Sequence, residues 1–214
     1  MAQGGPLVDL ARLSAPALSA STTGGMLRAA IFYYGRIVLN GNRTLREIAA
    51  ALAATPSERV LDFACGCGGF CLAVPGRYVG IDLNPNYLAF ARWRWGNPRR
   101  HFELTRLEEM PDEERFDAAI MASALHHLSD ELADVILGRL ARMVTSRIVV
   151  LDHDPEAANR PQRVLIDIDR GTYIRPVARQ RALLERHFVV TGQRRVVTTT
   201  GSAVHVLFEC RPRR

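Results

Sequence analysis

The chain has 214 residues, the length of one ordinary domain, and its 48% hydrophobic and 23% charged residues exclude collagenous and disordered classes. No apolar run approaches the roughly 18–20 residues of a membrane span. Asp9, Arg12 and Pro16 interrupt the N-terminal stretch where a signal peptide needs its apolar core. We therefore expect a cytoplasmic protein that does not associate with membranes.

All 28 basic residues are arginine, and the formal net charge is +6. Without lysine, Schiff-base chemistry, a P-loop lysine and pyridoxal phosphate anchoring are excluded. The positive charge permits a nucleic-acid partner or an anionic substrate. The arginines are spread along the whole chain, which favours a solvated surface over a nucleic-acid groove.

Three of the four cysteines, Cys65, Cys67 and Cys71, lie in one glycine-rich stretch, and the fourth is Cys210. Their spacing lacks the paired C-x2-C pattern of zinc sites and does not match iron–sulfur runs. We expect reduced thiols and no metal.

The chain divides into three parts. Residues 1–22 have the composition of a flexible leader, residues 23–56 carry two N-terminal helices, and residues 57–214 form the main domain. Strands are predicted at Arg59–Ala64, Tyr78–Asp82, His101–Leu104, Phe116–Met121 and Arg147–Asp152. Helices are predicted at Met26–Leu39, Thr44–Ala54, Phe70–Val74, Pro85–Trp95, Asp130–Met143 and Pro176–His187. Alternation of this kind indicates a mostly parallel sheet with helices on both faces.

The last third of the pattern differs. Two long β runs, Phe188–Thr200 and Ser202–Cys210, meet at Thr200-Gly201 and predict a closing antiparallel hairpin. The predicted fold class is therefore α/β, a doubly wound Rossmann-like sheet with a C-terminal antiparallel hairpin.

A nucleotide site is indicated where the first predicted strand runs into the turn Ala64-Cys65-Gly66-Cys67-Gly68. Glycines there let the backbone approach a ligand closely and leave N–H groups available. The second strand ends in Asp82, and in a doubly wound sheet this acid faces the same crevice, where it accepts hydrogen bonds from a ribose diol. The direct inference is an adenosine-containing cofactor.

The kind of cofactor follows from two further residues. A dinucleotide fingerprint needs a third glycine where this chain has Cys71. Asp62, just before the turn, disfavours a pyrophosphate and favours a cationic ligand such as the sulfonium and ammonium of S-adenosylmethionine.

The residues Asp62, Ala64, Gly66 and Gly68 resemble the D-x-[GA]-x-G-x-G motif of the class I S-adenosylmethionine-dependent methyltransferases, with alanine at the usual first glycine. Phe116-Asp117 and the sequence LHHL at 125–128 resemble the family's fourth-strand motif. The resemblance implies a seven-stranded sheet, with S-adenosyl-L-methionine as cofactor and S-adenosyl-L-homocysteine as product. The cofactor-binding residues that it implies are Asp62, Ala64, Gly66, Gly68, Asp82, Leu83, Arg106, Leu107 and Ala122. Arg106 stands where the family usually has an acid that contacts adenine.

Candidate catalytic residues lie where the fourth and fifth strands end: His126, His127, Asp152 and His153. A general base assists methyl transfer to a hydroxyl or a protonated amine. His153 stands between two acids, which raise the pKa of an imidazolium. The alternative is that these side chains cap or pack against neighbouring helices.

Acceptor-binding candidates come from two segments. The resemblance implies that the N-terminal helices and an insertion over residues 153–176 cover the acceptor pocket. The candidates are Tyr33, Tyr34, Arg170, Tyr173 and Arg175. Arginines bind carboxylates or phosphates, but Arg170 could equally pair with a nearby acid, and the tyrosines could simply dock their helix.

The leading hypothesis is an enzyme that methylates an oxygen, or else a nitrogen or carbon, of a small molecule in secondary metabolism. One alternative is an RNA or other nucleic-acid methyltransferase, against which stands the absence of a [DN]-P-P-[YFW] motif. The other alternative is a cofactor-binding scaffold that has lost catalysis. The sequence assigns no oligomeric state.

Overall fold

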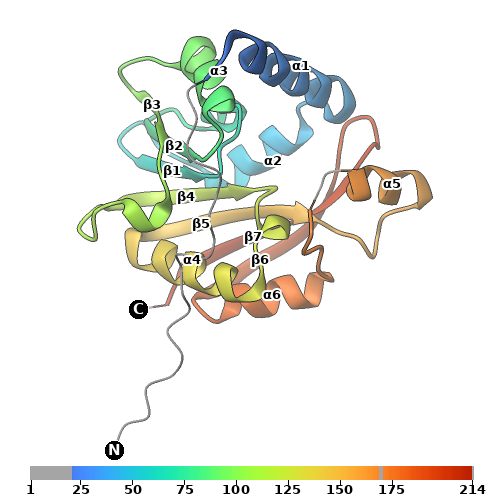
Figure 1. Cartoon of the computed structure of the whole chain (residues 1–214). Coiled ribbons are helices and arrows are strands. Elements are labelled where there is room, and N and C mark those ends of the chain that lie inside the picture. Colours follow the sequence, from blue (N-terminus) through green and yellow to red (C-terminus); the bar gives the residue numbers. More distant parts are fainter. Residues whose placement is uncertain (1–20, 169–170, 214) are drawn as a thin grey trace, which may run out of the picture.

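The computed structural model describes residues 21–168 and 171–213, built around one seven-stranded sheet (Figure 1). The strand order is β3-β2-β1-β4-β5-β7-β6. The strands are β1 (Arg59–Phe63), β2 (Arg77–Asp82), β3 (Arg100–Leu104), β4 (Phe116–Ala122), β5 (Val144–His153), β6 (Phe188–Val197) and β7 (Val204–Pro212). The first five pair in parallel, and β7 pairs antiparallel with both β5 and β6. The predicted fold class, including its closing hairpin, is confirmed.

Helices and short 3-10 turns connect the strands. The helices are α1 (Thr23–Asn40), α2 (Arg43–Leu52), α3 (Pro85–Trp95), α4 (Asp130–Met143), α5 (Arg160–Ile168) and α6 (Val177–Glu185). The 3-10 turns are η2 (Gly69–Ala73), η3 (Leu107–Glu109) and η4 (Leu125–His127). The predicted helices at Pro85–Trp95 and Asp130–Met143 are confirmed, whereas α5 was not predicted and the segment after β1 is only a 3-10 turn.

Two hydrophobic layers cover the sheet because successive strand residues point to opposite faces. Leu61 packs into the layer that contains α4 and α6, and its neighbour Val60 packs into the layer that contains α2 and α3. In β5, Val150 and Val149 divide in the same way. Both faces of the parallel strands are therefore buried, as a parallel sheet requires.

Helix α1 lies across the carboxyl ends of the strands. The Tyr33 ring packs 5.4 Å from that of Phe90 and 5.8 Å from that of Trp95, both on α3. At its other end, Asn40 accepts a hydrogen bond from the backbone N–H of Thr199 in the β6–β7 turn. The helix therefore bridges two distant parts of the sheet edge.

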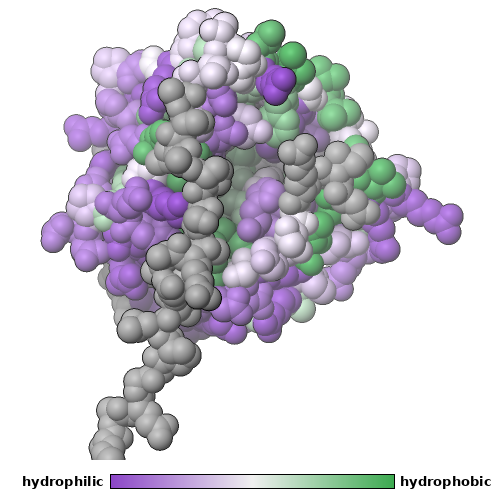
Figure 2. All heavy atoms as spheres, viewed as in Figure 1, coloured by the Kyte–Doolittle hydropathy of each residue, from purple (hydrophilic) through white to green (hydrophobic). Residues whose placement is uncertain are grey.

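The outer side of α1 carries apolar side chains that the rest of the described chain leaves exposed (Figure 2). They include Leu27, Ile31 and Val38. Within the described residues, no helix combines the length and the apolar character that crossing a membrane demands. Most of the predicted leader, residues 1–20, lies outside the described residues.

Candidate active site

The turn after β1 is built from residues with left-handed backbone conformations. Ala64, Gly66 and Gly68 have φ angles of 56°, 54° and 73°. A Cβ on Gly68 would lie 2.5 Å from the Phe102 ring, so this position requires glycine for space as well as for φ. A Cβ on Gly66 would meet no atom within 4 Å, because this backbone borders an open cavity.

Asp82 at the end of β2 is fixed by backbone donors. The N–H of Gly66 donates to its Oδ2 over 2.8 Å, and the N–H of Asn84 donates to its Oδ1 over 2.8 Å. Burial raises the pKa of Asp82, and the backbone hydrogen bonds oppose that rise. Each oxygen keeps a further lone pair for a ligand hydroxyl. The carboxylate is thus tied to the glycine turn in the position expected of a ribose acceptor.

Asp62 has a different setting from the one expected. Its side chain is almost fully buried, and its Oδ2 accepts a 2.6 Å hydrogen bond from the hydroxyl of Tyr78 on β2. Burial raises the pKa of Asp62 to about 7, against the lowering effect of the Tyr78 hydrogen bond. Asp62 is not among the described residues that line the cavity, and its contact with cofactor charge stays a prediction.

A cavity of about 1880 Å³ opens above the turn and beneath α1. Typical ligand pockets measure roughly 300–1,000 Å³, so this one has room for a nucleoside cofactor and a second molecule. The predicted cofactor residues that line it are Ala64, Gly66, Asp82, Leu83, Arg106, Leu107 and Ala122. Gly68 lies behind the turn, packed against Phe102 and Ala91.

Several lining residues escaped sequence reasoning. Ser123 and Ala124 continue the wall beyond β4, and Arg28, Phe32 and Arg36 project from α1. Ser123 has a φ of 53°, a backbone feature that its residue type does not signal. The α1 residues recur every three to four positions, which is the spacing of one helix face. That periodicity could have predicted that they line the same surface.

The two acceptor-binding candidates on α1 differ in whether they line the cavity. Tyr33 lines the cavity, and burial raises the pKa of its hydroxyl. Tyr34 is half-exposed, packs edge-on against Tyr33 and Phe90, and is not among the described residues that line the cavity.

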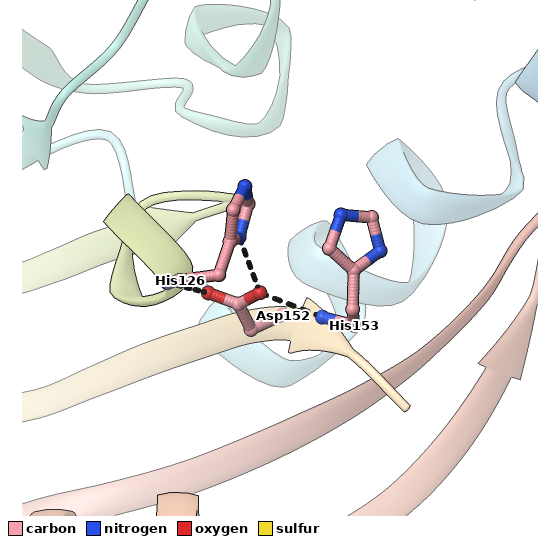
Figure 3. A group of neighbouring side chains, drawn as sticks. All are labelled: His126, Asp152 and His153. Atoms are coloured by element: carbon pink, nitrogen blue, oxygen red, sulfur yellow. Dashed lines mark hydrogen bonds and ion pairs between the residues drawn. The ribbon is translucent and has the colours of Figure 1, made fainter. Parts of the chain in front are cut away.

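The candidate catalytic residues lie in two different places. His127 lines the cavity, whereas His126, Asp152 and His153 line a separate small chamber (Figure 3). The rings of His126 and His127 lie 4.1 Å apart between centroids, and those of His126 and His153 lie 4.6 Å apart. The strand ends bring all four residues together as expected, but only His127 borders the cavity within the described part of the chain.

The insertion residues close that chamber. Tyr173 donates its backbone N–H to the His126 carbonyl over 3.0 Å. Arg175 is buried, pairs with Asp130 at 2.7 Å, and donates to the carbonyls of Leu125 and Leu128. Its guanidinium therefore fixes the η4 turn in place. Arg170 lies outside the described residues.

The sheet order, the glycine turn and the acid at the end of β2 together define the class I methyltransferase fold. Residues 60–147 match the family model described as a methyltransferase domain. This segment holds the turn, Asp82 and the η4 histidines, and the predicted resemblance to the family is confirmed.

Three known proteins are similar to this chain, two of them in fold. The chain is 26% identical over 173 residues to a ubiquinone biosynthesis O-methyltransferase of Bradyrhizobium sp. (strain ORS 278), covering 72% of this chain and 68% of the relative. The crystal structure of magnesium protoporphyrin IX methyltransferase from Synechocystis PCC 6803 matches with a TM-score of 0.65 at 21% identity, covering 89% and 95% of the two chains. The N-methyltransferase NodS of Bradyrhizobium japonicum WM9 matches with a TM-score of 0.66 at 15% identity, covering 84% and 91%. Both crystal structures hold S-adenosylhomocysteine, in agreement with the predicted cofactor.

Proposed function

We propose that this protein transfers a methyl group from S-adenosylmethionine to an oxygen of a small-molecule acceptor. The observation that carries the proposal is Asp82, held by the Gly66 and Asn84 N–H groups at the edge of a cavity that continues to α1. One end of this cavity suits a nucleoside, and its volume leaves space for an acceptor.

The residues present fit this cofactor. Gly66 brings bare backbone to the cavity, and Asp82 offers carboxylate oxygens to a ribose diol. S-adenosylmethionine supplies an activated methyl group when bound, so the chain needs only to align the acceptor and to exclude water. Helix α1 forms the wall that covers the acceptor, through Phe32 and Tyr33.

His127 is the candidate general base. It lies on η4, directly after the strand end at Ala122, and borders the cavity. A neutral imidazole there takes the proton of an acceptor hydroxyl as the oxygen attacks the methyl group. His126, one residue earlier, is buried and directs its Nδ1 to Asp152 over 2.6 Å. The two neighbouring histidines therefore have different roles.

The acceptor is proposed to be a secondary metabolite in the cytoplasm. The relative named for ubiquinone biosynthesis is an O-methyltransferase, which supports oxygen as the accepting atom ahead of nitrogen or carbon. The enzymes encoded by neighbouring genes indicate which metabolites to test first as acceptors.

The first experiment measures S-adenosylmethionine binding by calorimetry and then screens metabolite extracts with methyl-labelled cofactor. We expect binding, and transfer of label to a small organic product. Binding without transfer to any extract favours the scaffold alternative, and label in RNA favours the nucleic-acid alternative. If the cofactor does not bind, the proposal is wrong.

The second experiment replaces His127 by alanine. The rate of label transfer should fall by about 10²–10⁴-fold, the range for a lost general base, with unchanged cofactor affinity. The matched control is His101→Ala on β3, an exposed histidine outside the described cavity lining, which should retain the full rate. Equal rates for the two variants would remove His127 from the reaction.

A further inference from the structure

We propose that His126, His153 and Asp152 form a site for a divalent transition-metal ion, in the chamber beside the cofactor cavity. Each residue offers a ligand atom, and these atoms lie within 4.8 Å of one another. All three side chains are buried. Figure 3 shows the two imidazole rings rising in the same direction from η4 and from the end of β5, with the carboxylate at their base.

The Asp152 carboxylate orders this cluster. Its Oδ1 is 2.6 Å from Nδ1 of His126 and accepts the backbone N–H of His153 over 2.7 Å, and its Oδ2 accepts the backbone N–H of His126 over 3.1 Å. Loss of the proton that Nδ1 of His126 shares with Oδ1 of Asp152 leaves a lone pair on each of these two atoms, and both can then bind the same cation.

Gln180 on α6 provides an independent observation. Its side chain is 3% exposed and borders the same chamber. Its amide nitrogen donates to the carbonyls of His153 and Arg175, over 2.7 and 2.9 Å, which fixes the orientation of the amide. Its Oε1 is buried and accepts no hydrogen bond from the described residues. A buried carbonyl oxygen held in this way is costly without a partner, and a cation is a suitable one.

The donor set indicates the class of metal. Two imidazoles with carboxylate and amide oxygens suit zinc, manganese, iron or cobalt better than magnesium or calcium, which prefer oxygen alone. The chamber has no room for a water molecule, so its ligands would come from side chains. Such an ion would join η4, the end of β5 and α6. The proposal departs from our expectation of no metal, which rested on the cysteines.

Cobalt(II) is the probe, because its visible absorption reports its coordination. The full chain, treated with a chelator and then dialysed, should take up about one ion and develop visible bands of nitrogen–oxygen coordination. Thermal unfolding should shift upward with cobalt concentration, since ligands that bind the native state stabilise it. His153→Gln should abolish both responses. The control His187→Gln removes another histidine that lies beside a carboxylate, Asp134, and should keep both.

Wild-type protein offers a readout that does not depend on a variant folding. Bound cobalt should strongly shift the nuclear magnetic resonance signals of the His126 and His153 rings and leave those of His101 on β3 in place. No uptake, equal uptake by His153→Gln, or a shift of the His101 signals as large as that of the His126 and His153 signals would overturn the proposal. None of these measurements involves methyl transfer, so their outcome is independent of the proposed function.

Discussion

The two ends of the cavity are built differently. The cofactor end consists of strand ends and backbone: the turn after β1 and one carboxylate, Asp82, which accepts the Gly66 N–H. The acceptor end consists of side chains from α1 and from η4, including Tyr33 and His127. The first end is fixed by residues close in sequence or paired in register, and the second is assembled by tertiary packing.

This difference affects how substitutions change stability and ligand affinity. Backbone groups in a turn between two buried strands are held by the same ladder that holds the core, so changes there alter stability and cofactor affinity together. Changes on α1 mainly alter the acceptor wall. The following substitutions measure how stability and cofactor affinity depend on the cofactor end, starting with the largest expected effect.

Gly68→Ala should cost about 4 kcal/mol of unfolding free energy. A non-glycine residue in the left-handed region costs roughly 1–3 kcal/mol, and overpacking adds roughly 1–3 kcal/mol, because the new Cβ would meet Phe102 at 2.5 Å. Gly66→Ala is the matched control, since it has a similar φ but no neighbour within 4 Å. Urea unfolding measures both. If the two variants lose equal stability, close packing behind the turn is not what requires Gly68.

The same contrast explains what the sequence could predict. The turn, Asp82 and the boundaries of Pro85–Trp95 followed from glycine positions, strand ends and a proline at the helix start. Which of the adjacent histidines faces the cavity depends on the 3-10 geometry of η4, which no periodicity encodes.

Two other features depended on packing across the fold. Arg175 looked like a ligand clamp, yet it pairs with Asp130 and with the η4 carbonyls, because the insertion folds back on that turn. Asp62 was predicted to favour a cationic ligand, which stays a prediction, and its hydrogen bond from the Tyr78 hydroxyl, which the pairing of β1 with β2 makes possible, was not predicted.

Asp62→Asn should remove a pH dependence of stability. The folded pKa of about 7 lies above the ordinary value of 3.8, so the folded state holds a proton that the unfolded state has lost. The contribution of Asp62 is complete below pH 4 and is lost as the pH rises toward 7. Relative to Asp62→Asn, the wild type should lose about 3 kcal/mol of unfolding free energy over that range.

Urea unfolding of both proteins at several pH values gives this difference directly. Glu103→Gln, an exposed acid on β3, is the control and should follow the wild type. A constant difference between Asp62→Asn and wild type would mean that Asp62 is ionised in the folded protein.

Asp82→Ala should weaken S-adenosylmethionine binding by about 1–3 kcal/mol, because buried ribose hydroxyls lose their acceptor. The Gly66 N–H loses its partner as well, so stability should fall by a smaller amount. Calorimetry measures the affinity, with Glu103→Ala as the control on the neighbouring strand. An unchanged dissociation constant would show that the ribose lies elsewhere.

Ala64→Gly tests the smallest difference, the one place where the turn departs from the family motif. Ala64 has a φ of 56°, which costs an L-residue about 1–2 kcal/mol. Glycine removes that strain, but it loses more conformational entropy on folding than alanine, which lowers stability by roughly 0.5–1 kcal/mol. The substitution should therefore raise the unfolding free energy by about 0.5–1 kcal/mol, measured by urea unfolding. Ala119→Gly, at a buried position within β4, is the opposing control and should lose stability, because glycine there only removes a packed methyl group. A loss of stability at Ala64 as well would mean that its methyl group contributes packing that outweighs its strained backbone.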